Sequence, residues 1–127
     1  MTKLLQIYKC EICGNVVEVL HTGAGALVCC KVEMVLMEEQ TAEMKTEKHV
    51  PVISDENGAY KVFVGSTPHP MIEKHYIEWV QLISGDKTYR IFMHPEQEPG
   101  AVFECKPQPV WAREYCNIHG LWKGEKA

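Results

Sequence analysis

The sequence predicts an all-β protein with two domains: a small cysteine-rich metal-binding domain over residues 1–37 and a β-sandwich over residues 38–127. From residue 50 onward, short runs of β-branched and aromatic residues alternate with turn signals such as Asp55-Glu-Asn-Gly58. No segment of useful length shows the apolar repeat of a helix. Four of the six cysteines lie in the first 30 residues, a segment too short to bury a core of its own.

Composition sets limits on where the protein works and what it binds. The chain has 127 residues, 46% of them hydrophobic, and no apolar run approaches the ~20 residues of a membrane span. Its first residues, Met-Thr-Lys-Leu-Leu-Gln, lack the features of a signal peptide. The net charge is −4 and there is no basic tract, so nucleic acid is not an expected partner. We therefore expect a soluble, cytoplasmic protein without a membrane partner.

The cysteines of the small domain form two close pairs. Cys10 and Cys13, followed by Gly14, have the form of a metal knuckle, in which backbone N–H groups turn toward the sulfurs. Cys29 and Cys30 are adjacent, so bringing both sulfurs to one ion must distort the backbone or the tetrahedron. Zinc and a single iron both suit four thiolates. The segment's stability must come from the metal, from the next domain or from a second copy of itself.

The larger domain reads as a series of about seven short strands behind a polar linker that begins at Met37. A strand is expected over 16–20 in the small domain, and strands are expected over 50–53, 60–64, 75–83, 88–93, 102–105 and 110–116 in the larger one. The longest run is apolar on both faces and is expected to be an inner strand. One face carries Ile77, Trp79 and Ile83, and the other carries Tyr76, Val80 and Leu82. We assign Trp79, Trp111 and Trp122 to packing.

A Cys-x-x-His motif near the end of the chain indicates a second metal site. Cys116 and His119 can reach one ion when the chain turns between them, and Asn117 and Gly120 favour such a turn. Alone, this motif is more often a buried thiol beside a surface histidine.

Three further histidines at expected strand ends strengthen this interpretation, and they are His49, His69 and His75. Four imidazoles and one thiolate exceed what tetrahedral zinc needs. They indicate a five-coordinate, redox-active ion with one open position. His21 and His94 each lie beside a turn, without the local context of a ligand, and are expected to be exposed. Cys105 is expected to be a free thiol.

Taken together, these residues resemble desulfoferrodoxin, the two-iron form of superoxide reductase. The resemblance runs in order through essentially the whole chain. It is carried by Tyr8-Lys-Cys-Glu-Ile-Cys-Gly-Asn15, Val28-Cys-Cys30, Glu47-Lys-His-Val-Pro-Val52, His69-Pro-Met71, Glu73-Lys-His-Tyr-Ile-Glu-Trp79 and Ala112-Arg-Glu-Tyr-Cys-Asn-Ile-His-Gly-Leu-Trp122. One departure is Lys31-Val32-Glu33, where relatives often carry Gly-Lys-Pro; it removes no ligand.

The resemblance implies a fold, two cofactors and an activity. Cys10, Cys13, Cys29 and Cys30 would hold a distorted rubredoxin-like iron in a desulforedoxin-like domain. A second iron would have His49, His69, His75 and His119 as equatorial ligands and Cys116 as axial ligand, in an immunoglobulin-like sandwich. The implied reaction is one-electron reduction of superoxide to hydrogen peroxide. The family also implies a homodimer and a small electron-donor protein such as a rubredoxin.

The same resemblance implies roles for the two residues that precede His49. Glu47 would ligate the ferric ion after turnover, and Lys48 would attract superoxide and organise the water that supplies protons. Two other functions stay open at this point. One is an electron carrier that does not turn over superoxide, and the other is a structural zinc-binding module.

Overall fold

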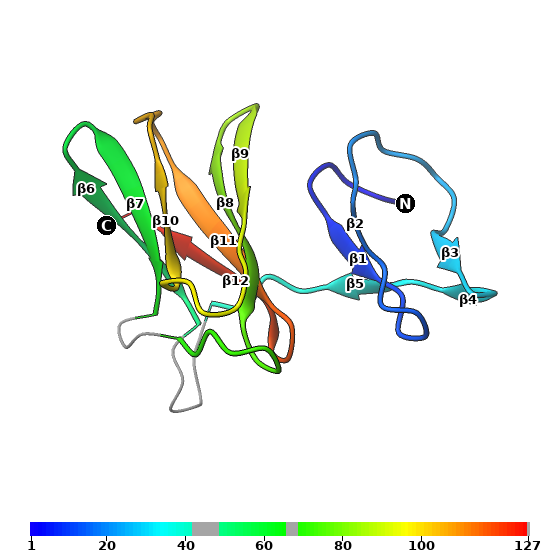
Figure 1. The fold of residues 1–127 in the computed structure, drawn as a ribbon. Helices are drawn as coiled ribbons and strands as arrows, with labels where there is room; N and C mark the ends of the chain where they lie inside the picture. Colours follow the sequence, from blue (N-terminus) through cyan, green and yellow to red (C-terminus); the bar gives the residue numbers. More distant parts are fainter. Residues whose placement is uncertain (42–48, 66–68, 127) are drawn as a thin grey trace. The chain divides into compact units, whose positions relative to one another are not determined.

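The structure is a computed structural model that describes residues 1–41, 49–65 and 69–126. These residues form strands, turns and loops without a helix, so the predicted all-β class is confirmed. Among them there is accordingly no helix that could cross a membrane. The chain divides into two compact units, Met1–Glu38 and Glu39–Ala127 (Figure 1).

The first unit is built from short strands around a very small core. Its three-stranded antiparallel sheet has the order β2-β1-β5, and a separate hairpin joins β3 to β4. The strands are β1 (Ile7–Lys9), β2 (Val16–Glu18), β3 (Val28–Cys29), β4 (Val32–Glu33) and β5 (Val35–Met37). Its buried apolar side chains are Ile7, Cys10 and Val19. A core of this size agrees with the expectation that the segment needs a metal or a partner for stability.

The second unit is a sandwich of two antiparallel sheets, seen face to face in Figure 1. The sheets have the orders β10-β7-β6 and β12-β11-β8-β9. Their strands are β6 (Pro51–Glu56), β7 (Ala59–Val64), β8 (Ile77–Ser84), β9 (Lys87–Phe92), β10 (Gly100–Phe103), β11 (Trp111–Cys116) and β12 (Gly120–Glu125). β8 is an inner strand, as predicted from its two apolar faces. β12 was not predicted, because its two glycines obscure the strand pattern.

A β-bulge corrects the face assigned to Ile77. Trp79 pairs with Tyr115, but Ile77 pairs with Cys116, so the register between β8 and β11 shifts by one residue. A bulge of this kind turns the following side chain to the other face of the sheet. Ile77 therefore joins Val80 in the core cluster instead of sharing a face with Trp79. The bulge therefore affects the orientation of the segment that contains His75 and leads into β8.

A glycine in β12 allows the two sheets to close on each other beside His49. A Cβ atom at Gly124 would overlap the carbonyl oxygen of Pro51, and it would lie 3.2 Å from the Val50 side chain. Both residues follow His49 directly in the chain. Packing near this histidine therefore depends on the absence of a side chain at Gly124.

Candidate metal centres

The four cysteines of the first unit converge on one point. The sulfurs of Cys13 and Cys29 are 3.5 Å apart and those of Cys29 and Cys30 are 3.9 Å apart. All four ligand atoms lie within 4.8 Å of one another. A disulfide needs about 2.05 Å between sulfurs. A tetrahedron of sulfurs about 2.3 Å from a metal has edges of about 3.8 Å, which is the spacing that this group shows.

The knuckle stabilises negative charge on its first sulfur. The backbone N–H of Cys13 donates to Cys10 Sγ at 3.5 Å, and Gly14 takes a φ of 87° in the same turn. That backbone hydrogen bond lowers the pKa of the Cys10 thiol to about 6. Conversely, hydrogen bonding among the thiols, to Cys13 above all, raises the pKa of Cys30 to about 12. All four sulfurs can thus be thiolates at neutral pH only when a cation binds among them.

The adjacent cysteines distort the backbone, as their spacing predicted. Cys30 and Lys31 have φ values of 54° and 67°, and they form the two-residue loop between β3 and β4. Positive φ at both central residues defines a type I′ turn, which favours Asn or Gly and is strained for other residues. Lys31, the first residue of the Lys31-Val32-Glu33 departure, therefore sits in this strained turn, and the cysteine group remains intact.

The second group gathers residues from three connecting segments of the sandwich. His49 precedes β6, His75 precedes β8, and Cys116 ends β11. His119 lies in the turn from β11 to β12, which closes with Gly120 at a φ of 86°. His69 lies in the connection from β7 to β8. Their ligand atoms all lie within 4.8 Å of one another.

The four imidazoles stand at the corners of a square. Neighbouring ring centroids are separated by 4.6 Å, 4.7 Å, 5.0 Å and 4.7 Å in the order His49, His69, His75, His119 and back to His49. The His49–His75 diagonal is longer, at 6.4 Å. Each neighbouring pair is nearly perpendicular, with interplanar angles from 69° to 82°. Rings arranged in this way direct nitrogens at a shared centre instead of stacking on one another.

Individual contacts show which atoms face that centre. His119 Nδ1 lies 3.0 Å from His49 Nε2 and 4.0 Å from Cys116 Sγ. His69 Nδ1 lies 2.7 Å from the carbonyl oxygen of Pro70. Because a carbonyl only accepts, this contact requires the Nδ1–H tautomer and puts the ring's lone pair on Nε2. The backbone N–H of His119 donates to Cys116 Sγ at 3.5 Å, which favours the thiolate.

This donor set fits a single metal ion. Nitrogen and sulfur ligands bind at about 2.0–2.3 Å, so opposite ligands lie about 4–4.6 Å apart, close to the observed limit of 4.8 Å. Imidazole suits zinc, copper, iron and nickel, and one thiolate adds a soft donor. Cys116, His49 and His69 are buried, whereas His75 and His119 are half-buried, so solvent reaches one side of the group.

Residues outside the two groups also have clear positions. His21 and His94 are exposed, as predicted. Cys105 is a free, half-buried thiol that belongs to neither group. Glu47 and Lys48 lie outside the described residues.

Several residues that surround the histidines were not predicted from the sequence. Trp122 was assigned to packing and is buried, but its ring also stacks on His49 at 4.8 Å and 17°. Its Nε1–H donates to the carbonyl of His119 at 3.1 Å, and Gln40 Nε2 donates to the same oxygen at 2.9 Å. Glu114 is fully buried two residues before Cys116. The available signal for Glu114 was the pair of adjacent charged residues, Arg113 and Glu114, inside a strand whose other residues are apolar or aromatic.

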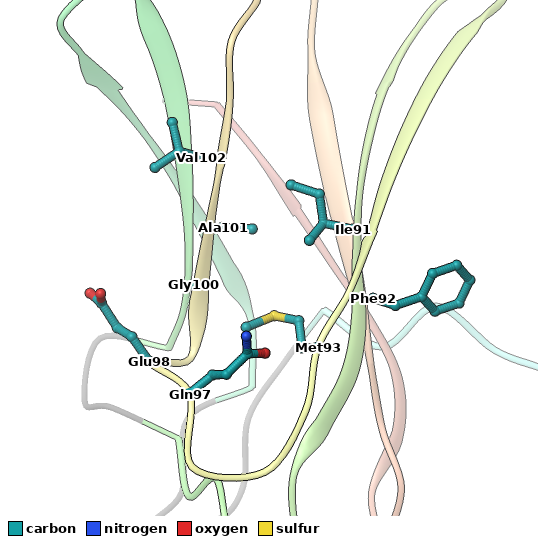
Figure 2. Close-up of a pocket in the computed structure, with 8 residues that line it drawn as sticks. All are labelled: Ile91, Phe92, Met93, Gln97, Glu98, Gly100, Ala101 and Val102. Carbon is teal, nitrogen blue, oxygen red and sulfur yellow. The ribbon is translucent and has the colours of Figure 1, made fainter.

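The open edge of the sandwich, between β9 and β10, contains no residue of the two metal-ligand groups. Ile91 and Met93 point into a hollow there, whereas Phe92 points away from it (Figure 2). The lining residues include none of the cysteines and histidines of the two groups. The candidate reaction site is therefore the histidine–cysteine group and not this hollow.

Known proteins match the chain over nearly its whole length. Residues 2–37 match the family described as desulfoferrodoxin, N-terminal domain, and residues 41–125 match the family described as desulfoferrodoxin. The chain is 57% identical over 125 residues to a desulfoferrodoxin of Desulfarculus baarsii. That alignment covers 98% of this chain and 99% of the other protein. A superoxide reductase of Thermococcus kodakarensis is 36% identical, over 68% of this chain and 91% of its own length.

Solved structures give the same result. The superoxide reductase from Treponema pallidum aligns with a TM-score of 0.77 at 25% identity, over 95% of this chain and 98% of that one. A superoxide reductase from Giardia intestinalis aligns with a TM-score of 0.54 at 30% identity, over 62% of this chain and 96% of its own.

Proposed function

The chain belongs to the desulfoferrodoxin family, and from that premise we propose that it reduces superoxide at its histidine–cysteine group. The protein is a superoxide reductase with two iron centres, an oxidoreductase that uses superoxide as the acceptor. We assign His49, His69, His75, Cys116 and His119 as ligands of the catalytic iron. The observation that carries this assignment is the square of four imidazoles with one thiolate beside it.

The reaction needs one electron and two protons for each superoxide, and it yields one hydrogen peroxide. When bound, the iron supplies the electron. Cys116 is fully buried, and the N–H of His119 favours the thiolate form of its sulfur. The half-buried edges of His75 and His119 leave a side open to a small anion and to the water that delivers protons.

Lys48 and Glu47 are proposed to act at that open side. Lys48 adjoins His49 and Glu47 lies two residues before it, so both side chains start close in sequence to a proposed ligand. The protein's net charge of −4 would repel superoxide, and screening over about 8 Å makes a nearby lysine outweigh distant charges. Lys48 would attract the anion and order water, and Glu47 would ligate the ferric ion after turnover.

Replacing Lys48 tests its role in this proposal. We expect Lys48→Ala to slow the second-order reaction of the reduced protein with superoxide by roughly tenfold and to flatten its dependence on salt. Pulse radiolysis at two ionic strengths measures both. An unchanged rate constant and salt slope would remove Lys48 from the mechanism.

Cys10, Cys13, Cys29 and Cys30 are proposed to hold the first iron. Cys13 and Cys30 are exposed, so this centre is accessible to a small electron-donor protein such as a rubredoxin. We propose functional domains over 1–37 and 38–127. None of the six cysteines forms a disulfide, which supports a reducing compartment, and we propose the cytoplasm.

The first unit is also proposed to form a homodimer with a second copy of itself. Many of its large apolar side chains are exposed, and they are Leu4, Ile12, Val17, Leu20, Val28, Val32, Val35 and Leu36. Its core is too small to account for an ordered sheet alone. Apolar surface on this scale in so short a segment favours burial against another copy.

The product balance tests the proposed function. Anaerobically reduced protein mixed with superoxide should form hydrogen peroxide without releasing oxygen. A simple electron carrier would be oxidised by chemical oxidants but would not speed the loss of superoxide. A structural zinc module would contain zinc and have no visible colour. Either outcome would overturn the proposal.

A further inference from the structure

We propose that Asn117 is a positioning residue that locks the turn carrying Cys116 and His119 to the backbone around His75. It would thereby hold His75 at a fixed separation from Cys116 and His119, which lie in a different connection. The inference rests on the proposed function, because it takes these three residues as ligands of one iron. Asn117 itself does not touch the ion.

The link consists of three hydrogen bonds. Asn117 Oδ1 accepts from the backbone N–H of Tyr76 at 2.9 Å, and Asn117 Nδ2 donates to the carbonyl of Lys74 at 3.1 Å. The backbone N–H of Asn117 donates to the carbonyl of Tyr76 at 3.2 Å. The side-chain amide therefore grips the chain on both sides of His75. Of the side chains of this size, only asparagine offers one acceptor and two donors without charge.

His75 is held from its other side as well. Its N–H donates to the carbonyl of Ile72, and the N–H of Ile72 donates back to the carbonyl of His75, both at 3.0 Å. The main chain of His75 thus lies between a tight turn and the amide of Asn117. With the backbone fixed in this way, the imidazole has little freedom besides its own side-chain torsions.

The position of Asn117 lets these hydrogen bonds fix the geometry of the metal site. β11 pairs with β8 as far as Cys116 and Ile77, and Asn117 continues that contact past the end of the strand. The link spans one side of the histidine square, between His75 and His119, whose centroids are 5.0 Å apart. This is the longest of the four sides, and its two histidines are the half-buried ones. Core packing alone fixes this side less than it fixes His49 and His69.

The test compares three variants of the full-length iron protein. Asn117→Ala removes both side-chain bonds, and Asn117→Asp keeps the acceptor for Tyr76 but loses the donor to Lys74. Tyr60→Phe is the matched control, because it removes the hydrogen bond of a buried tyrosine to the carbonyl of Pro107 at 3.2 Å, and neither residue belongs to a metal group. The measurements are the ferric EPR spectrum, which reports the symmetry of the ligand plane, and the rate of iron loss to a chelator.

We expect Asn117→Ala to broaden or split the ferric signal and to speed iron loss by about tenfold, a change equivalent to about 1.4 kcal/mol. Asn117→Asp should fall between this variant and the parent, and Tyr60→Phe should match the parent in both measurements. A purely structural role predicts a lower melting temperature for Asn117→Ala with the parent's spectrum and release rate. That result would overturn the inference.

Three further outcomes are decisive. If Asn117→Ala does not fold, hydrogen exchange in the zinc-loaded parent decides, because the Tyr76 amide should be protected and fast exchange there would overturn the inference. If the parent itself lacks a ferric histidine–thiolate signal, the proposed function fails instead. If the parent shows that signal and Asn117→Ala matches it in spectrum and in the rate of iron loss, the inference about Asn117 is wrong and the proposed function still stands.

Discussion

The two metal groups of this chain are built in opposite ways. In the first unit the four cysteines lie within two turns of a segment with three buried apolar side chains. In the second, ligands as far apart as His49 and His119 meet because a sandwich with a continuous core brings their loops together. The first centre is one where the metal organises the chain, whereas the second is one that the fold organises for the metal.

Burial follows the same division. Cys13 and Cys30 are exposed. A backbone N–H lowers the pKa of Cys10, whereas hydrogen bonding to Cys13 and the other thiols raises the pKa of Cys30. Cys116 and His49 are fully buried, and Trp122 and Gln40 brace the turn around His119. A pre-arranged site suits catalysis, because the ligands do not have to be reorganised at each turnover. A local, exposed site suits structural support or electron entry.

The largest expected effect is loss of the proposed thiolate ligand of the catalytic iron. Cys116→Ser should abolish the long-wavelength thiolate band of the ferric protein while the spectrum of the four-cysteine centre remains. Cys105→Ser is the matched control, because that thiol lies in the same unit outside both groups. Visible spectra of the oxidised variants measure the effect. The reverse pattern would reassign the ligand.

A second prediction tests whether the fold organises the catalytic site. Gly124→Ala places a methyl group against the Pro51 carbonyl oxygen, beside His49. We expect it to destabilise the second unit by about 2 kcal/mol, within the range for overpacking. Thermal loss of the thiolate band should occur at a lower temperature than in the parent. An unchanged midpoint would show that the sheets can separate there without affecting the centre.

A smaller effect is expected in the first unit. Lys31 has a φ of 67° in the turn beside Cys30. Replacing it with glycine removes the steric penalty of about 1–2 kcal/mol, although the greater freedom of the unfolded chain offsets some of that gain. We expect Lys31→Gly to slow metal loss from the four-cysteine centre by about two- to fivefold, as measured with a chelator. Faster loss would show that the lysine side chain supports the centre.

The sequence predicted the two groups for different reasons. The paired cysteines were recognisable from spacing, since Cys10, Cys13, Cys29 and Cys30 lie within one short segment. The histidines were only suspected from their places at strand ends. Residues this far apart meet only through the topology of the sandwich, so the count of four imidazoles and one thiolate suggested a five-coordinate site, and the family resemblance assigned each ligand its role.

Other features depended on tertiary detail that periodicity does not contain. Alternating patterns predicted most of the sandwich, but the bulge between β8 and β11 reversed the face of Ile77. The glycines of β12 concealed a strand whose partner is β11. Asn117 was predicted only to favour a turn, because its contacts with Lys74 and Tyr76 cross between distant segments of the chain.

The most direct test of the account is the reaction of reduced Cys13→Ser protein with superoxide. Cys13 belongs to the local group and the catalytic ligands belong to the other, so the two centres have no ligand in common. Rapid mixing or pulse radiolysis should give a second-order rate constant within about twofold of the parent's, although the four-cysteine centre is lost or altered. Absence of reaction in folded protein that retains its histidine–thiolate iron would contradict an independent catalytic site.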